Sequence, residues 1–191
     1  MGIRSFLAFE TPPDMKGAMT RILEDVKRSK LNVRWVKVDN IHLTVVFIGN
    51  IREEDLSEIR AAIDPICRKY GPFKLSLRGL GSFPNPRRPR VIWAGLDGDI
   101  ERMSCLKDDL QRQLKAFGLK DEKRAFRPHL TLGRFRKSVR GGFPVEDLIS
   151  RYADFRGNLC ELDELILFKS DLKPGGAVYN KLGSWKLTGT E

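Results

Sequence analysis

Residues 41–48 read Ile-His-Leu-Thr-Val-Val-Phe-Ile and are followed by Gly49-Asn50. β-Branched and aromatic residues favour the pleated strand, and Gly-Asn favours a turn, so this stretch predicts a β-strand that ends at Gly49. Side chains two residues apart in a strand point to the same face. His42 and Thr44 therefore share one face. Leu43 and Phe47 are expected on the other face, in the core.

The same pattern occurs a second time at residues 128–133, which read Pro-His-Leu-Thr-Leu-Gly. His42 and His129 are the only histidines in the chain. A strand here also places His129 and Thr131 on one face. Histidine exchanges protons near neutral pH, with a reference pKa of about 6.5. The two stretches thus suggest a paired acid and base, each with a hydroxyl beside it.

The rest of the sequence alternates between strand and helix patterns. Strands are expected at 3–9, 73–80, 91–94, 162–169 and 177–187, and helices at about 12–26, 53–69, 99–117 and 144–152. This order is typical of an α+β fold with mostly antiparallel pairing. We expect a bilobal, duplicated fold of two mostly antiparallel sheets flanked by helices. Residues 1–191 would form a single domain of two pseudo-symmetric lobes, which supply the motifs 42–45 and 129–132 to a cleft between them.

Length and composition set the class of protein. The chain has 191 residues, of which 41% are hydrophobic and 31% charged, as in globular proteins. No apolar stretch approaches the roughly 18 residues of a membrane helix, and the first residues lack the apolar core of a signal peptide. We therefore expect a cytoplasmic protein without a membrane partner. Cys67, Cys105 and Cys160 form no Cys-x-x-Cys pair, which argues against a disulfide framework or a zinc cluster.

A formal net charge of +10 favours a polyanionic partner such as RNA. Basic residues gather in the proline-rich stretch 84–90 and on both sides of the second motif: Arg87, Arg88, Arg90, Lys123, Arg124, Arg127, Arg134, Arg136, Lys137 and Arg140. Arg90 and Arg127 are candidate RNA contacts. Phe83 and Trp93 flank the proline-rich stretch, where they either pack in the core or stack on RNA bases.

Two imidazoles suit the in-line hydrolysis of a phosphodiester. One neutral imidazole accepts a proton from water, and one protonated imidazole gives a proton to the leaving oxygen. Hydroxyls of Thr44 and Thr131, with the guanidinium of Arg134, can donate hydrogen bonds to the phosphoryl oxygens. Two histidines make a poor zinc site, which needs three or four ligands, so no metal is expected. A threonine nucleophile would need a base and an orienting group behind it, and ranks lower.

The chain resembles the 2H phosphoesterase superfamily, and within it the RNA 2′,3′-cyclic phosphodiesterase family, also called 2′-5′ RNA ligases. The resemblance rests on the two His-x-Thr motifs and on residues 4–8, 42–49, 83–93 and 127–134, and it spans nearly the whole chain. It implies a cleft active site that opens a terminal 2′,3′-cyclic phosphate of RNA and leaves a 2′-phosphate. No cofactor, metal or obligate protein partner is implied.

The resemblance also implies roles for individual residues. His42 would be the proton donor to the departing 3′ oxygen and His129 the acceptor that activates water. Thr44, Thr131 and Arg134 would bind the phosphate. Run with an RNA 5′-hydroxyl in place of water, the same chemistry would join tRNA halves by a 2′-5′ bond. Alternative hypotheses are a phosphodiesterase for small cyclic nucleotides or 2′-5′ oligoadenylates, and a non-catalytic module that binds RNA ends.

Overall fold

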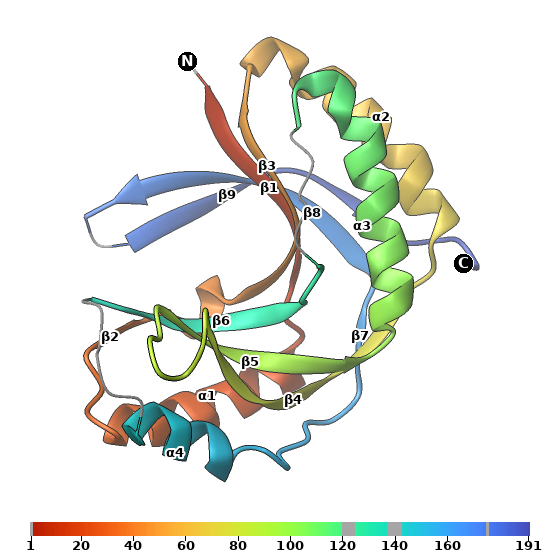
Figure 1. Ribbon diagram of the computed structural model, residues 1–191. Helices are drawn as coiled ribbons and strands as arrows, with labels where there is room; N and C mark the ends of the chain where they lie inside the picture. The colour runs from red at the N-terminus through yellow and green to blue at the C-terminus, as the bar shows by residue number, and fades with distance from the viewer. Residues whose placement is uncertain (1, 120–124, 137–142, 175) are drawn as a thin grey trace.

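The computed structural model describes residues 2–119, 125–136, 143–174 and 176–191, and it combines antiparallel strands with four helices over these residues (Figure 1). The strands are β1 (Ile3–Glu10), β2 (Val33–Trp35), β3 (His42–Ile51), β4 (Phe73–Phe83), β5 (Val91–Gly98), β6 (His129–Phe135), β7 (Cys160–Leu162), β8 (Glu164–Lys173) and β9 (Gly176–Lys186). The helices are α1 (Pro13–Arg28), α2 (Leu56–Lys69), α3 (Ile100–Leu114) and α4 (Phe143–Arg151). The predicted α+β class is confirmed.

The strands form one continuous antiparallel sheet in the order β7-β4-β5-β6-β3-β1-β8-β9, with β2 paired to the far end of β6. The strands β3 and β6 meet at a single residue pair, Leu43 with Leu130. The prediction of two sheets is therefore corrected, because the two motif strands are direct neighbours in one curled sheet. The backbones of these two leucines, each between the histidine and the threonine of its motif, therefore join the two halves of the sheet.

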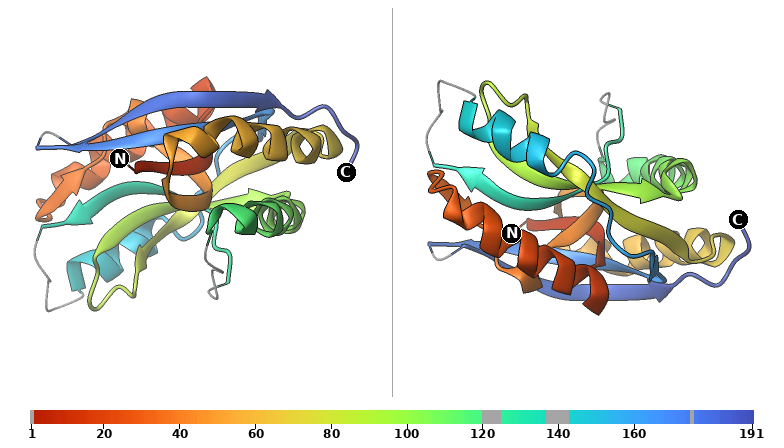
Figure 2. Two further views of the ribbon diagram at one scale, coloured as in Figure 1. Left: turned by 90° about the horizontal axis from the view of Figure 1, so that it is seen from above. Right: turned by 90° about the horizontal axis from the view of Figure 1, so that it is seen from below.

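The helices cover the sheet in two pairs. α2 and α3 lie together on the right in Figure 1, and α1 and α4 lie together at the bottom; the views in Figure 2 show the same pairing. The hydroxyl of Tyr152, just beyond α4, donates a hydrogen bond of 2.8 Å to Asp25 in α1. Each helix is amphipathic, and its apolar side chains enter one main core with one face of the sheet.

The strand β1 is buried on both faces. Leu7 and Phe9 enter the main core, whereas Phe6 and Ala8 join a second, smaller cluster with residues of β8 and β9 on the opposite face. This second face carries the histidines, as the ring contacts below show. No helix among the described residues is long and apolar enough to cross a membrane.

The expected core position of Phe47 is wrong. Leu7 pairs with Val46 and Ala8 pairs with Thr44, so Val45 is an extra residue, a β-bulge in β3. Val45 and Val46 are both buried, and the alternation is reversed beyond them. Phe47 consequently lies on the face of His42, where 68% of its surface is exposed.

Candidate active site

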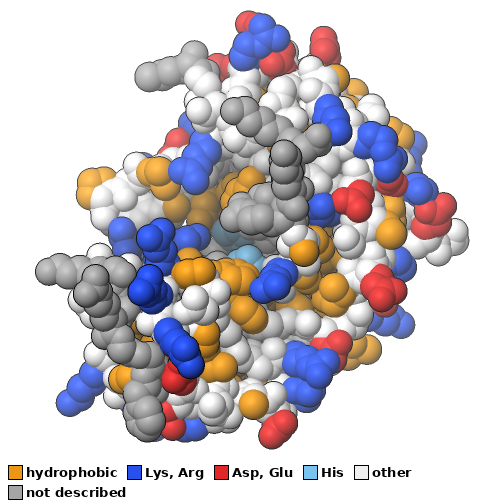
Figure 3. Space-filling view, viewed as in Figure 1, with side chains coloured by type: hydrophobic (Ala, Val, Ile, Leu, Met, Phe, Trp, Pro, Cys, Tyr) orange, Lys and Arg blue, Asp and Glu red, His pale blue; other side chains and the backbone are white. Residues whose placement is uncertain are grey.

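The two histidines are the first residues of β3 and β6. The strands are antiparallel and pair at the leucine that follows each histidine. This register places His42 beside Thr131 and Thr44 beside His129, with all four side chains on one face. Figure 3 shows a hollow on this side of the molecule, with histidine side chains at its floor and lysines and arginines around it. The structure thus brings the predicted quartet together.

Both imidazoles are held in the same tautomer. Nδ1 of His42 lies 2.9 Å from the carbonyl oxygen of Asn40, and Nδ1 of His129 lies 2.7 Å from that of Arg127. A carbonyl oxygen only accepts hydrogen bonds, so each Nδ1 carries the hydrogen and donates it. Nε2 is therefore the nitrogen of each ring that is left to exchange a proton with a ligand. Arg127, whose side chain is exposed, orients His129 through its backbone.

Burial lowers the pKa of both histidines because it penalises the charged imidazolium. The bonds to the backbone carbonyls oppose this effect. The positive charge of Arg134 lowers the pKa of both rings further, and the charge of His129 lowers that of His42. Arg134 therefore lies within electrostatic reach of both imidazoles.

Arg134 faces the histidines because β6 contains the same irregularity as β3. Thr131 pairs with Trp93 and Gly133 with Ile92, so Leu132 is an extra residue. The bulge turns Arg134 to the face of Thr131, and its side chain is exposed. Among the described residues, its guanidinium has no ion-pair partner. It is free to bind an anion.

Thr44 and Thr131 are half-buried, and neither hydroxyl has a hydrogen-bond partner among the described residues. Two free hydroxyls, two Nε2 atoms and one guanidinium thus converge from β3 and β6. These groups can donate several hydrogen bonds to a phosphate while the imidazoles transfer protons. Binding of a phosphate by these groups stays a prediction.

Aromatic rings surround His42. Phe6 of β1 stacks on its imidazole at a centroid distance of 4.8 Å, and Tyr179 of β9 meets it edge-on at 4.9 Å. Phe168 of β8 lies 6.3 Å away. These three rings were not predicted from the sequence, because strand pairing brings them to His42 from distant positions. The only local signal was that β1 is apolar at successive positions, which is typical of a strand buried on both faces.

Phe83 and Trp93 lie against the other imidazole. The ring of Phe83 meets His129 edge-on at 4.9 Å, and that of Trp93 lies 6.1 Å from it. Both side chains are half-buried, and Trp93 packs over Gly81, where a Cβ would collide with the indole. Phe83 and Trp93 therefore position His129. Their stacking on RNA stays a prediction.

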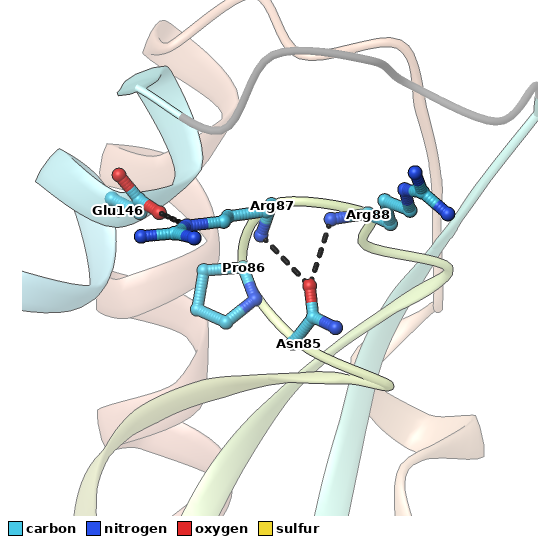
Figure 4. A pocket seen from close by; sticks show the side chains of 5 residues that line it. All are labelled: Asn85, Pro86, Arg87, Arg88 and Glu146. Atoms are coloured by element: carbon cyan, nitrogen blue, oxygen red, sulfur yellow. Dashed lines mark hydrogen bonds and ion pairs between the residues drawn. The ribbon is translucent and has the colours of Figure 1, made fainter.

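The proline-rich stretch connects β4 to β5 beside α4. The side-chain oxygen of Asn85 accepts hydrogen bonds from the backbone N–H groups of Arg87 and Arg88, at 3.1 and 3.0 Å (Figure 4). Arg87 also lies 3.7 Å from Glu146 of α4. With Pro86 these residues line a hollow of about 440 Å³, which contains neither histidine.

Arg90 lies at the Arg134 end of β6, because its carbonyl oxygen accepts a hydrogen bond of 3.0 Å from the N–H of Phe135. Its side chain is exposed, and contact with RNA stays a prediction. Four of the basic residues singled out in the sequence lie outside the described residues: Lys123, Arg124, Lys137 and Arg140.

The cysteines Cys67, Cys105 and Cys160 are unpaired in the structure. Within residues 2–119, 125–136, 143–174 and 176–191, no group of three or more His, Cys, Asp or Glu side chains is placed to hold a metal ion.

Comparison with known proteins identifies the family of the chain. The family model described as LigT like Phosphoesterase matches residues 9–93 and 96–179. The RNA 2′,3′-cyclic phosphodiesterase of Methanothermobacter thermautotrophicus is 32% identical over 187 residues, 98% of this chain and 100% of that protein. The protein of the same name from Aeropyrum pernix is 32% identical over 168 residues, 88% of this chain and 94% of that one.

Solved structures share the fold. The protein TT0787 of Thermus thermophilus has a TM-score of 0.83 and 27% identity, over 99% of this chain and 100% of that chain. E. coli LigT complexed with 3′-AMP has a TM-score of 0.75 and 23% identity, over 98% of this chain and 99% of that chain. The fold and its paired His-x-Thr motifs define a two-histidine phosphoesterase. The chain belongs to the LigT-like phosphoesterase family.

Proposed function

We propose that this protein hydrolyses the terminal 2′,3′-cyclic phosphate of RNA and leaves a 2′-phosphate. The observation that carries the proposal is the pair of imidazoles with free Nε2 atoms, each placed beside a threonine hydroxyl of the other motif. The names of the relatives from M. thermautotrophicus and A. pernix support the choice of RNA as substrate. The net charge of +10 supports it as well.

In the proposed reaction the bond from phosphorus to the 3′ oxygen breaks as a bond from phosphorus to water forms. Nε2 of neutral His129 accepts the proton of the attacking water. Nε2 of protonated His42 gives its proton to the departing 3′ oxygen. Thr44, Thr131 and Arg134 donate hydrogen bonds to the phosphoryl oxygens, which carry more negative charge in the transition state. Proton exchange with solvent then restores both histidines.

Substitution of each histidine by asparagine tests this proposal. An asparagine amide can replace Nδ1 as the donor to the backbone carbonyl but has no group at the position of Nε2. We expect His42→Asn and His129→Asn to lower kcat on a cyclic-ended oligonucleotide by at least ~10²-fold, the usual effect of losing an acid or base. The assay contains EDTA, so activity there also tests the expectation that no metal is needed.

Two other outcomes would indicate a different function. Binding of RNA ends without turnover at any pH would indicate a non-catalytic module. A kcat/KM that is higher for a 2′-5′ oligoadenylate or a cyclic mononucleotide than for cyclic-ended RNA would move the substrate to those classes. Full activity of either asparagine variant would exclude a mechanism in which one histidine is the acid and the other is the base.

We propose 2′-5′ ligation as the same step with an RNA 5′-hydroxyl in place of water. The 5′-hydroxyl oxygen forms a bond to phosphorus as the bond to the 3′ oxygen breaks, so His129 accepts the proton of the hydroxyl and His42 gives a proton to the 3′ oxygen, as in hydrolysis. Incubation of a tRNA half that ends in a 2′,3′-cyclic phosphate with its 5′-hydroxyl partner tests this. We expect the wild-type protein to form joined RNA and His129→Asn to form none. Absence of joined RNA from the wild-type reaction would exclude ligation.

We also propose that residues 1–191 form one domain of two pseudo-symmetric lobes, with residues 42–45 in one and 129–132 in the other. The two consecutive matches to one family model, and the bulge that follows each motif, support it. We expect a single transition in thermal unfolding followed by tryptophan fluorescence and by circular dichroism. Two separate transitions would contradict a single domain.

A further inference from the structure

The most exposed aromatic ring on the histidine face is Phe47. Phenylalanine is usually buried, but 68% of this side chain is exposed. Its ring centroid lies 6.2 Å from that of Phe6, which in turn stacks on His42 at 4.8 Å. Phe47 therefore lies one buried ring away from the imidazole, with its own surface open to a ligand.

The backbone directs Phe47 to this face in the same way as it directs Arg134. Each residue is fifth after the histidine of its motif, and in each strand a bulge directly after the threonine reverses the alternation. Without the bulges both side chains would point to the core face. One strand thus presents a guanidinium to the site, and the equivalent position of the other presents a flat apolar ring.

A second cation lies beyond Phe47. Arg4 shares a face of β1 with Phe6, the residue that pairs with Phe47, and lies two residues further along, about 7 Å away. Its charge reaches Tyr179, which meets His42 edge-on. Among the described residues, Arg4 has no hydrogen-bond or ion-pair partner. The face therefore runs from the phosphate site at Thr44 to an aromatic ring and then to a free guanidinium.

This order matches the order of groups in the end of an RNA strand. We propose that Phe47 stacks on the base of the terminal nucleotide and that Arg4 binds the phosphodiester on its 5′ side. The inference rests on the proposed function, since it takes the cyclic phosphate to lie between the two motifs. Aromatic faces stack on bases of any sequence, and arginine binds phosphate oxygens through paired N–H donors.

Two small substrates separate the two contacts. Adenosine 2′,3′-cyclic phosphate has a base but no 5′ phosphate, and its 5′-phosphorylated form has both. We expect Phe47→Leu to raise KM about tenfold for both substrates, as for the loss of one base stack, with kcat changed less than about twofold. We expect the wild-type protein to prefer the 5′-phosphorylated substrate in kcat/KM by about fivefold or more, and Arg4→Gln to remove that preference.

Matched controls remove an apolar side chain or a positive charge elsewhere. Leu159 is 63% exposed, and Arg21 is exposed on α1. Leu159→Ala and Arg21→Gln should keep wild-type KM values and the wild-type preference. An unchanged KM in Phe47→Leu would overturn the stacking contact. A 5′-phosphate preference that survives Arg4→Gln, or that is absent from the wild-type protein, would overturn the phosphate contact.

Binding of product-like ligands separates this subsite from the proposed function. Calorimetry with adenosine 2′-phosphate and adenosine 2′,5′-bisphosphate needs no turnover. We expect the wild-type protein to bind both ligands and to bind the bisphosphate more tightly, and we expect Arg4→Gln to bind the two equally. This result would support the subsite even if the protein does not hydrolyse cyclic phosphates. Equal affinity of wild-type protein and both variants for the two ligands would overturn the subsite whatever the activity.

Discussion

At the scale of single residues, the two histidines have the same tautomer but different surroundings. Both Nδ1 atoms donate to a carbonyl oxygen two residues earlier in the chain. His42 is enclosed by Phe6, Tyr179 and Phe168, whereas His129 rests against two rings of β4 and β5. The assignment of His42 as donor and His129 as acceptor comes from the family resemblance, and the pH dependence tests whether the site uses one acid and one base.

The pH profile of kcat/KM should be bell-shaped with its optimum below neutral pH. Activity falls at low pH when the base becomes protonated, and at high pH when the acid loses its proton. Burial and Arg134 lower the pKa of both histidines. The rising and the falling limb of the profile should therefore both lie at lower pH than for two ordinary histidines. Initial rates on a cyclic-ended oligonucleotide from about pH 4 to 9 measure this.

Arg134→Gln should move both limbs to higher pH. Removal of the positive charge makes each imidazolium easier to form, so the pKa of each ring rises. The same variant should also lower kcat, because a donor to the phosphate is lost. Arg21→Gln removes an equal charge on α1 and should leave the profile in place. Limbs that do not move in Arg134→Gln would show that this residue is not near the histidines.

At the scale of secondary structure elements, alternation and helical periodicity identified all four helices and seven of the nine strands that the structure describes. The strands β2 and β7 have three residues each, too few for a pattern of alternation. The bulges at Val45 and Leu132 also escaped prediction, since an extra aliphatic residue leaves no mark in a run of aliphatic residues. Simple alternation along residues 41–48 therefore predicts a core position for Phe47, which the bulge at Val45 reverses.

Cross-strand packing between β4 and β5 explains the need for Gly81. Gly81 pairs with Trp93, and Trp93 pairs with Thr131, in one row across the sheet. A Cβ at Gly81 would collide with the indole, which lies against His129. We expect Gly81→Ala to lower the free energy of unfolding by about 1–3 kcal/mol, as in other overpacked sites. It should also reduce kcat, because Trp93 must move.

Gly17 provides the matched control in α1. A Cβ there would meet nothing within 4 Å. We expect Gly17→Ala to raise the free energy of unfolding by about 0.5–1 kcal/mol, the usual gain in a helix, with activity unchanged. Urea unfolding of both variants measures the difference. Equal stability of Gly81→Ala and the wild-type protein would mean that the Trp93 ring does not fill this space.

At the scale of the whole molecule, the order of elements predicted the α+β class but not the continuity of the sheet. A single pair, Leu43 with Leu130, makes the two halves one sheet. Pairing between strands so distant in sequence depends on the curvature of both halves, which local patterns do not encode. The same pairing places the histidine of each motif beside the threonine of the other motif.

The net charge of +10 predicts a dependence on salt that grows with the length of the substrate. Each phosphate that contacts a basic side chain releases condensed counterions, so affinity falls as salt rises, with a log–log slope of about −0.7 per contact on single strands. We expect a steeper slope of kcat/KM for a cyclic-ended decanucleotide than for a cyclic mononucleotide. Equal slopes would show that no phosphate beyond the terminal one contacts the protein.

The position of the phosphate in the product tests the paired acid and base most directly. An oligoribonucleotide that ends in a 2′,3′-cyclic phosphate is incubated with the wild-type protein in EDTA and analysed by ³¹P NMR. Protonation of the 3′ oxygen by His42 predicts that all product carries a 2′-phosphate, and that His42→Asn and His129→Asn form none at a comparable rate. A 3′-phosphate product, or full turnover by either variant, would contradict the assignment.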